Sequence, residues 1–579
     1  MTKLIKYLRN YKKESVIGPL FKLLEACFEL IVPLIMANII DIGIKNQDMP
    51  YIWKMGSILV LFGILGLACS LTAQYFAAKA AVGFGTELRH DLFQHIGELS
   101  YTEIDKAGNS TLITRMTSDI NQAQSGVNLV LRLFLRSPFI VVGALVMACT
   151  ISLKLSVIFL IAVPLLSVVI YGIMMATIPL YKKVQRSLDR VLLTTRENLT
   201  GIRVVRAFRT QEIEKKEFAE QSDALMRLQV WVGRISALLN PLTYVIVNAA
   251  IICIVWFGGK EVYVGTLTQG EVIALVNYMS QILLALVALS NLIITFTKAL
   301  ASAGRINEIF ALQASIREGE GAKSAESVSR AKIEMRNVEF VYAGDKSSVL
   351  SGINVAIEKG ETVGIIGGTG SGKSTFVNLL PRFYDVTKGE ILVDGINVKE
   401  YGLNELRKKF GIVPQKAVLF HGTIRENMRY GKENASDEEI WKALCIAQAE
   451  EFVKGKQNEL DEIISEGGKN LSGGQRQRLT IARALVRKPE ILILDDSASA
   501  LDFATDAELR KAIRENTKDM TVFIVSQRAA SIMQADKIIV LDSGRIVGIG
   551  THEELLATCK VYQEICYSQL SKEEVAHHA

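Results

Sequence analysis

Six apolar segments, each long enough to cross a bilayer, restrict what this chain can fold into more than any other feature. They lie at about 16–41, 56–82, 127–149, 153–180, 238–258 and 270–299. About 20 predominantly apolar residues span the hydrocarbon core as a helix. Backbone polar groups in lipid must be satisfied within the segment, so we expect six membrane helices.

The connections between these segments indicate the orientation. Those after the second and fourth segments are long and polar, and the stretch 181–237 concentrates lysine and arginine. Basic loops stay in the cytoplasm, which predicts a multi-pass protein of the cell membrane with both long loops and both termini cytoplasmic. Helical periodicity continues into these loops, so we expect the helices to extend about 25 Å beyond the membrane. Short turn helices near Tyr101–Ala107 and Val204–Glu212 would contact a soluble domain.

Composition excludes several classes of protein. The net charge of +6 lies beside apolar segments, which fits inside-positive topology better than nucleic-acid binding. The seven cysteines form no C-x-x-C pair, so we expect packing residues and neither a zinc site nor a disulfide framework. The basic, amphipathic stretch from Met1 to about Ser15 predicts a helix at the membrane surface.

Charged residues inside the apolar segments are costly and are candidates for function. The first segment carries Lys22, Glu25 and Glu29 on one helical face, and the third carries Arg132 and Arg136. Two interpretations stay open. The acids form structural ion pairs with the arginines, or Glu25 and Glu29 line a pathway and contact cationic cargo.

The chain changes character after the last apolar segment. Residues 1–310 form the predicted membrane domain, 311–331 a polar linker, and 332–579 a soluble domain. The soluble domain opens with a strand-like alternation over 333–340.

A phosphate-binding loop follows the apolar run 362–366, which predicts a buried parallel strand. Its glycines let backbone N–H groups surround a polyphosphate, its lysine reaches the β- and γ-phosphates, and Ser374 offers a hydroxyl to Mg²⁺. A helix expected from Lys373 adds its N-terminal dipole to the anion site. The predicted ATP-binding residues are Gly367, Gly368, Thr369, Gly370, Ser371, Gly372, Lys373, Ser374 and Thr375.

A second motif, the signature, consists of Leu471, Ser472, Gly473, Gly474 and Gln475. With this motif and the phosphate-binding loop, the soluble domain resembles the ATPase domain of ATP-binding cassette (ABC) transporters. Over its full length the chain looks like one half of an exporter of that family. The resemblance implies a six-helix α transmembrane domain followed by an α/β P-loop ATPase domain. It also implies that the signature binds ATP held by a second subunit.

Further site residues are carried over from this resemblance. Tyr342 takes the place of an adenine-stacking ring, and Gln415 matches a glutamine that senses Mg²⁺ and the γ-phosphate. Asp495 ends the apolar strand 491–495 and is expected to hold Mg²⁺ with Ser374 and Gln415. Asp502 ends a loop, Ser499–Asp502, that communicates between two ATP sites in the family.

Two positions depart from the family pattern. Asp496 stands where the family has the glutamate that activates water, and Gln527 stands where it has a histidine. A base misplaced by about 1 Å can cost about 10²-fold in rate. Glutamine cannot carry the positive charge of a histidine. We therefore expect this site to bind ATP and hydrolyse it slowly, with a non-identical half-transporter as partner.

The sequence thus predicts the ATP-binding and permease subunit of a heterodimeric exporter of lipophilic or drug-like compounds. An ATP-gated or regulatory membrane protein, or a peptide or lipid exporter of the same architecture, are the alternatives. The intact signature favours the exporter, because it completes a hydrolytic site on a partner.

Overall fold

The computed structural model describes residues 2–319, 331–345, 347–497, 500–517 and 519–569. Two compact units emerge: Met1–Gly97 with Asn109–Leu312, and Glu98–Gly108 with Gln313–Ala579. The short segment Glu98–Gly108, which lies between two long helices in the chain, thus belongs to the second unit.

The first unit is helical. Among the described residues, six helical stretches are long and apolar enough to cross a membrane: Lys3–Ile44, Met49–Glu98, Asn109–Ile151, Leu153–Thr200, Gln211–Val264 and Gln269–Phe310. They contain the six predicted segments in order. Each stretch holds at least 42 residues, or about 63 Å at 1.5 Å per residue, so the helices extend well beyond a bilayer core of about 30 Å.

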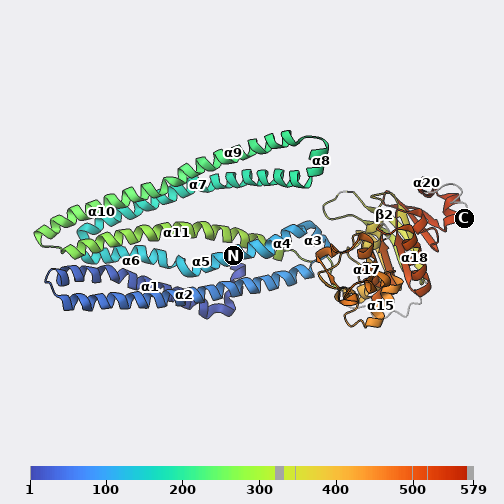
Figure 1. Cartoon of the computed structure of the whole chain (residues 1–579), viewed down its shortest axis with the longest axis horizontal. Coiled ribbons are helices and arrows are strands. Elements are labelled where there is room, and N and C mark those ends of the chain that lie inside the picture. The colour runs from blue at the N-terminus through green and yellow to red at the C-terminus, as the bar shows by residue number, and fades with distance from the viewer. Residues whose placement is uncertain (1, 320–330, 346, 498–499, 518, 570–579) are drawn as a thin grey trace. The chain divides into compact units, whose positions relative to one another are not determined.

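Its helices are η1 Thr2–Tyr11, α1 Lys12–Asn38, η2 Ile39–Ile44, α2 Met49–Glu98, α4 Asn109–Thr114, η3 Arg115–Asp119, α5 Ile120–Leu129, η4 Val130–Phe134, α6 Arg136–Ile151, α7 Leu153–Thr200, α8 Ile202–Ala207, α9 Gln211–Ala237, α10 Leu239–Val264 and α11 Gln269–Phe310. In Figure 1, α8 turns the chain between the long neighbours α7 and α9. The second predicted turn helix is therefore present, slightly before its expected position.

The N-terminal helix η1 is packed against protein. Leu4 and Tyr7 are buried, and the Tyr7 ring lies edge-on to that of Phe84 in α2 at 6.3 Å. At Tyr7, the apolar face predicted to lie on the membrane surface therefore packs against α2 instead.

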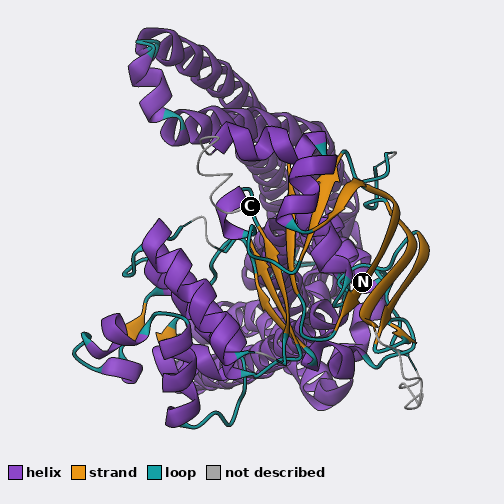
Figure 2. Ribbon diagram, turned by 90° about the vertical axis from the view of Figure 1, so that its right-hand side faces the viewer, coloured by secondary structure: helices purple, strands orange, loops and turns teal. Residues whose placement is uncertain are grey.

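The second unit is an α/β domain, whose strands are orange in Figure 2. It is built on a six-stranded sheet in the order β12-β11-β3-β10-β9-β6. Its strands are β3 Thr362–Gly367, β6 Phe410–Val413, β9 Ile491–Asp495, β10 Thr521–Val525, β11 Lys537–Asp542 and β12 Arg545–Gly550. All neighbours pair in parallel except β11 and β12. The fully buried pattern of β9 explains its uninterrupted apolar sequence.

The other described strands form two smaller sheets. One is antiparallel in the order β2-β1-β4-β5, with β1 Ala331–Phe340, β2 Leu350–Glu358, β4 Lys388–Val393 and β5 Ile396–Asn397. The other pairs β7 Gly422–Thr423 with β8 Ile463–Ile464. β1 confirms the strand predicted at 333–340.

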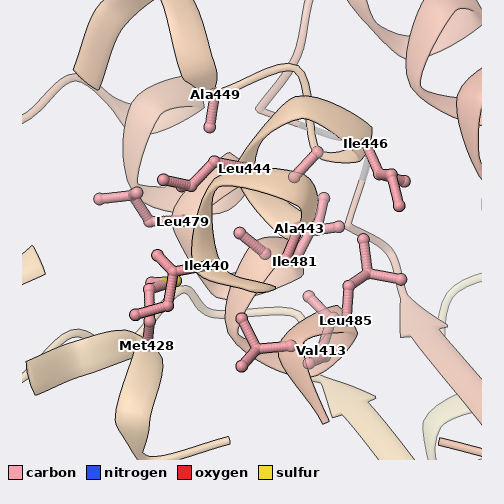
Figure 3. Close-up of a cluster of buried hydrophobic side chains, with 14 of the residues drawn as sticks. Val413, Met428, Ile440, Ala443, Leu444, Ile446, Ala449, Leu479, Ile481 and Leu485 are labelled. Carbon is pink, nitrogen blue, oxygen red and sulfur yellow. The ribbon is translucent and has the colours of Figure 1, made fainter. Parts of the chain in front are cut away.

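The helices of this unit are α3 Tyr101–Ala107, α12 Lys373–Leu379, α13 Leu403–Lys408, α14 Ile424–Arg429, α15 Asp437–Ile446, α16 Glu450–Lys454, η5 Glu459–Asp461, η6 Glu466–Gly468, α17 Gly473–Val486, α18 Phe503–Asn516, η7 Ala529–Ser531, α19 His552–Thr558 and α20 Lys560–Gln569. A core of buried side chains packs α15 and α17 against each other and against β6, as Figure 3 shows for Ile440, Leu479 and Val413.

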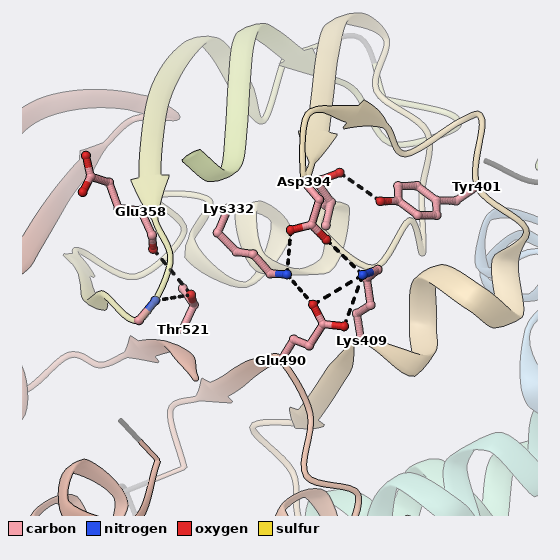
Figure 4. A network of polar contacts seen from close by, with 9 residues as sticks. Lys332, Glu358, Asp394, Tyr401, Lys409, Glu490 and Thr521 are labelled. Carbon is pink, nitrogen blue, oxygen red and sulfur yellow. Dashed lines mark hydrogen bonds and ion pairs between the residues drawn. The ribbon is translucent and has the colours of Figure 1, made fainter. Parts of the chain in front are cut away.

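A network of four charged side chains, of which Lys332 is buried, joins the two larger sheets (Figure 4). Lys332 of β1 bonds Asp394 at 2.7 Å and also pairs with Glu490, just before β9. Lys409 bonds the same two carboxylates, at 2.9 and 3.2 Å. The buried Lys332 ammonium thus has two carboxylates around it, which offsets the cost of removing its charge from water.

Candidate nucleotide site

The phosphate loop connects the end of β3 to the start of α12, as the sequence predicts. Gly372 precedes α12 with φ of 95°, a conformation that a residue with a side chain rarely adopts. At Gly367 a Cβ would lie 2.0 Å from the Leu541 carbonyl oxygen on the neighbouring strand. Glycine is therefore required at both ends of the loop.

An open cavity of 260 Å³ lies over this loop. It is lined by Val349, Thr369, Gly370, Ser371, Gly372, Lys373, Ser374, Thr375, Gln415, Asp495, Asp496, Val525 and Gln527. Most of the residues predicted to face ATP and Mg²⁺ thus come together. They derive from the loop after β3, from α12, from the end of β9 and from the segments that follow β6, β9 and β10, so the carboxyl ends of parallel strands supply the site.

The Lys373 side chain is hydrogen-bonded to the backbone of the phosphate loop. Its ammonium donates to the carbonyl oxygens of Gly367 and Gly368 at 2.8 and 2.7 Å. Burial lowers the pKa of Lys373, and the nearby Asp496 and Asp495 carboxylates oppose that shift. Without nucleotide, the carbonyl dipoles of the loop stabilise the Lys373 ammonium. A bound polyphosphate would add negative charge beside it and so favour its charged form.

Asp495 and Ser374 form the part of the site suited to a hard cation. The Ser374 hydroxyl donates to Asp495 Oδ1 at 3.1 Å. Burial raises the pKa of Asp495, and the Asp496 carboxylate adds to that increase. A hydroxyl and a carboxylate are oxygen ligands that fit Mg²⁺ beside a phosphate, and Gln415 supplies a further amide oxygen.

The two departures from the family pattern lie on the same cavity. Gln415 Nε2 donates to Asp496 Oδ2 at 3.3 Å, and the Asp496 backbone N–H donates to the Val525 carbonyl oxygen at 2.9 Å. Asp496 has φ of 48°, a region that aspartate tolerates better than most residues with side chains. Gln527 follows β10 with an exposed side chain, and its carbonyl oxygen accepts from Gln569 at 2.7 Å.

Other predicted residues lie outside the cavity lining. Tyr342 reaches it only through its hydroxyl, 3.0 Å from that of Thr375. Asp502 begins α18 and accepts from the Thr505 backbone N–H at 2.9 Å, so it has a local capping role. Ser499 lies outside the described residues.

The signature forms the N-terminus of α17, away from this chain's own phosphate loop lining. Ser472 and Gln475 make reciprocal capping bonds, since Ser472 N–H donates to Gln475 at 3.0 Å and Gln475 N–H donates to Ser472 at 3.2 Å. Gly474 lies next to the backbone of Ala500. Ser472 and Gly473 are exposed, which leaves the helix N-terminus open to an external phosphate.

Four of the five charged residues singled out in the membrane segments form ion pairs within the chain. Lys22 and Glu25 form a buried ion pair of 2.6 Å, and Lys22 also donates to Ser70 at 3.2 Å. Glu29 pairs with Arg136 at 2.7 Å, as one of the two interpretations expected. Arg132 bonds Gln74 at 3.3 Å and neither acid.

Two family models match the chain. The ABC transporter transmembrane region matches residues 15–286, and the ABC transporter model matches residues 350–499. A Mycobacterium tuberculosis protein described as an uncharacterized ABC transporter ATP-binding protein is 36% identical over 97% of each chain. This chain belongs to the ABC transporter family.

Further relatives agree on the architecture of this ABC exporter half-transporter. An ATP-dependent lipid A-core flippase of Haemophilus ducreyi is 30% identical over 98% of each chain. A Bacillus subtilis protein provisionally described as a multidrug export ATP-binding/permease protein is 31% identical over 96% of this chain and 97% of its own. A solved structure of a bacterial Atm1-family ABC exporter with ATP bound has a TM-score of 0.80 at 25% identity, covering 97% of this chain and 100% of that one. The predicted fold class is confirmed.

Two residues that the structure connects to this site were not predicted from the sequence. Tyr384, after α12, and Asp105, in α3, bond each other at 2.6 Å. The only sequence signals were an aromatic pair at 383–384 and the expectation that the helix 101–107 contacts a soluble domain.

Proposed function

We propose that this ABC exporter chain is the slow-hydrolysing subunit of a heterodimer that moves lipophilic or drug-like compounds outward across the cell membrane. The observation that carries the proposal is Asp496 and Gln527 on the same cavity as Lys373 and Asp495. The groups needed to bind ATP and Mg²⁺ are present. The groups needed to activate water and to place a positive charge by the γ-phosphate are replaced.

The chain's own residues would divide the work as follows. The loop amides, Lys373 and the α12 N-terminus bind the phosphates, while Ser374, Asp495 and Gln415 hold Mg²⁺. Asp496 orients water poorly, because its carboxylate is one methylene shorter than a glutamate and bonds Gln415. ATP at this site then stays bound for long periods.

The exposed signature supports a heterodimer. Ser472 and Gly473 stand open on a capped helix N-terminus. In a heterodimer they complete a site whose partner provides the glutamate and histidine that this chain lacks. A homodimer would offer two intact signatures to two slow sites.

The cargo class rests on the relatives. One of them is described in terms of multidrug export and another as a lipid A-core flippase. The first description supports a drug-like cargo, and the second supports a lipophilic one. A lipid is therefore the second candidate cargo, and a peptide has no support from these two names.

Inside-out vesicles that contain the chain and its partner test the proposal. Both ATPase domains face outward in such vesicles if the long loops are cytoplasmic. ATP-dependent accumulation of a lipophilic dye is expected. Binding of ATP without accumulation of dye or of labelled lipid would favour an ATP-gated or regulatory protein.

A further inference from the structure

Three aromatic rings pack together beside the nucleotide cavity. The Tyr342 ring lies edge-on to Phe340 at 4.8 Å and edge-on to Tyr384 at 5.3 Å. Tyr384 also lies 5.6 Å from Phe340. All three rings are buried or half-buried, so the Tyr384 ring limits the positions available to Tyr342.

The outer side of Tyr384 is bound to α3. Its hydroxyl donates to Asp105 Oδ2 at 2.6 Å, a short, charge-assisted bond. Burial raises the pKa of Tyr384, and the bond to Asp105 raises it further, so the hydroxyl keeps its proton at neutral pH. The Tyr101 ring of α3 adds a contact to Phe383 at 4.7 Å.

Backbone bonds fix α3 on the same domain. The Ile316 N–H donates to Ser100 Oγ at 3.1 Å, and the Ser315 N–H donates to Glu103 Oε2 at 3.3 Å. These bonds hold α3 in place, so the position of Asp105 beside Tyr384 is fixed.

The inner side of the cluster reaches the phosphate loop. The Tyr342 hydroxyl lies 3.0 Å from the Thr375 hydroxyl, and Thr375 is a buried residue of α12 that lines the cavity. Contacts thus run without a gap from Asp105 through Tyr384 and Tyr342 to Thr375.

We propose that Asp105 and Tyr384 are positioning residues for adenine recognition, which act by holding the Tyr342 ring against the base. The inference rests on the proposed function, ATP binding at this site, and on the expectation from the family resemblance that Tyr342 stacks on adenine. Loss of the Asp105 bond frees Tyr384 to turn, and Tyr342 then loses the neighbour that fixes its ring. By thermodynamic linkage, bound adenine in turn strengthens the hold on α3, the segment that joins α2 to α4 in the chain.

The test compares two ligands on the purified full-length chain by isothermal titration calorimetry. MgATP carries the base, whereas magnesium tripolyphosphate offers only phosphates. Asp105→Ala and Tyr384→Phe each remove the bond and keep a ring at 384. Tyr384→Leu removes the ring as well, and Tyr567→Phe, on the exposed face of α20, is the matched control.

Loss of one hydrogen bond predicts that Asp105→Ala and Tyr384→Phe weaken MgATP binding about 3- to 10-fold. The tripolyphosphate affinity of these variants should stay within about twofold of that of the native chain. Tyr384→Leu should weaken MgATP binding more than either Asp105→Ala or Tyr384→Phe does. The double variant Asp105→Ala/Tyr384→Phe should be no weaker than either single one, because both remove the same bond.

Equal weakening of both ligands would overturn the inference, since it would show a general loss of structure. Unchanged MgATP affinity in Tyr384→Phe would overturn it too. Tyr384→Phe, which keeps the ring and removes only the donor hydroxyl, carries the test if Asp105→Ala does not fold. A native chain that binds neither ligand would instead overturn the proposed function on which the inference depends.

Discussion

Gln415 Nε2 donates to Asp496 Oδ2 at 3.3 Å, across the cavity that faces the phosphate loop. The residue expected to sense the γ-phosphate is thus bonded to the residue in the place of the catalytic base. Asp496 also sits at φ of 48°, where aspartate is tolerated better than glutamate.

Asp496→Glu should raise ATP hydrolysis at this site, by about tenfold or more, because the longer side chain recovers the reach of a general base. The positive φ should make the variant slightly less stable. Single-turnover hydrolysis of pre-bound ATP measures the first effect, and thermal unfolding the second. Asp496→Asn is the control, and it should not hydrolyse faster. Equal rates for the glutamate variant and the native chain would place the defect elsewhere, with Gln527 the next candidate.

Lys373→Ala should weaken ATP binding at this chain's own site, because it removes the buried charge that would face the β- and γ-phosphates. Removal of one charged hydrogen-bond donor predicts a loss of about 10- to 100-fold in affinity. Turnover of the assembled pair should fall only in part. Complete loss of turnover, with the partner's site intact, would show that this site is catalytically required.

Asp495→Asn should stabilise the nucleotide-free chain and abolish its stabilisation by Mg²⁺ with ATP. Burial raises the pKa of Asp495, so its carboxylate costs stability at neutral pH, and this cost falls as the pH drops through the raised pKa. The difference in melting temperature between the variant and the native chain should therefore narrow in acid. A variant that melts lower than the native chain at pH 7 would contradict this account of Asp495.

Glu29→Gln should destabilise the membrane domain by about 1–3 kcal/mol, because it leaves the charge of Arg136 without its 2.7 Å partner. Glu29→Gln with Arg136→Gln should recover part of the loss. Melting in detergent measures both. If Glu29 instead contacts cationic cargo, Glu29→Gln should melt like the native chain, weaken export of a cationic dye and spare a neutral one.

The membrane helices and the phosphate loop were predictable because their signals are local. Apolar length alone located the six helices, and Thr362–Gly367 followed by Lys373 located the strand, loop and helix of the site. Parallel strands place their carboxyl ends together, so Asp495 could be assigned to the same site from its position at the end of a strand.

The remaining parts depend on contacts between residues far apart in the chain. The Lys22–Glu25 pair is local, because the two residues lie three positions apart on α1. Nothing local shows that Glu29 pairs with Arg136, because that pair depends on how α1 and α6 pack. Tyr384 and Asp105 are 279 residues apart, so their bond follows only from the folded domain. The buried position of Tyr7 likewise depends on α2 lying beside η1.

The central claim is that this chain binds ATP but needs a different subunit for rapid hydrolysis. The most direct measurement is the ATPase rate of the purified chain alone, compared with the rate of the chain assembled with a non-identical half-transporter encoded beside it. The chain alone should bind ATP and hydrolyse it slowly, and the assembled pair should show a clearly higher ATPase rate. Brisk ATP hydrolysis and transport by the chain alone would contradict the central claim.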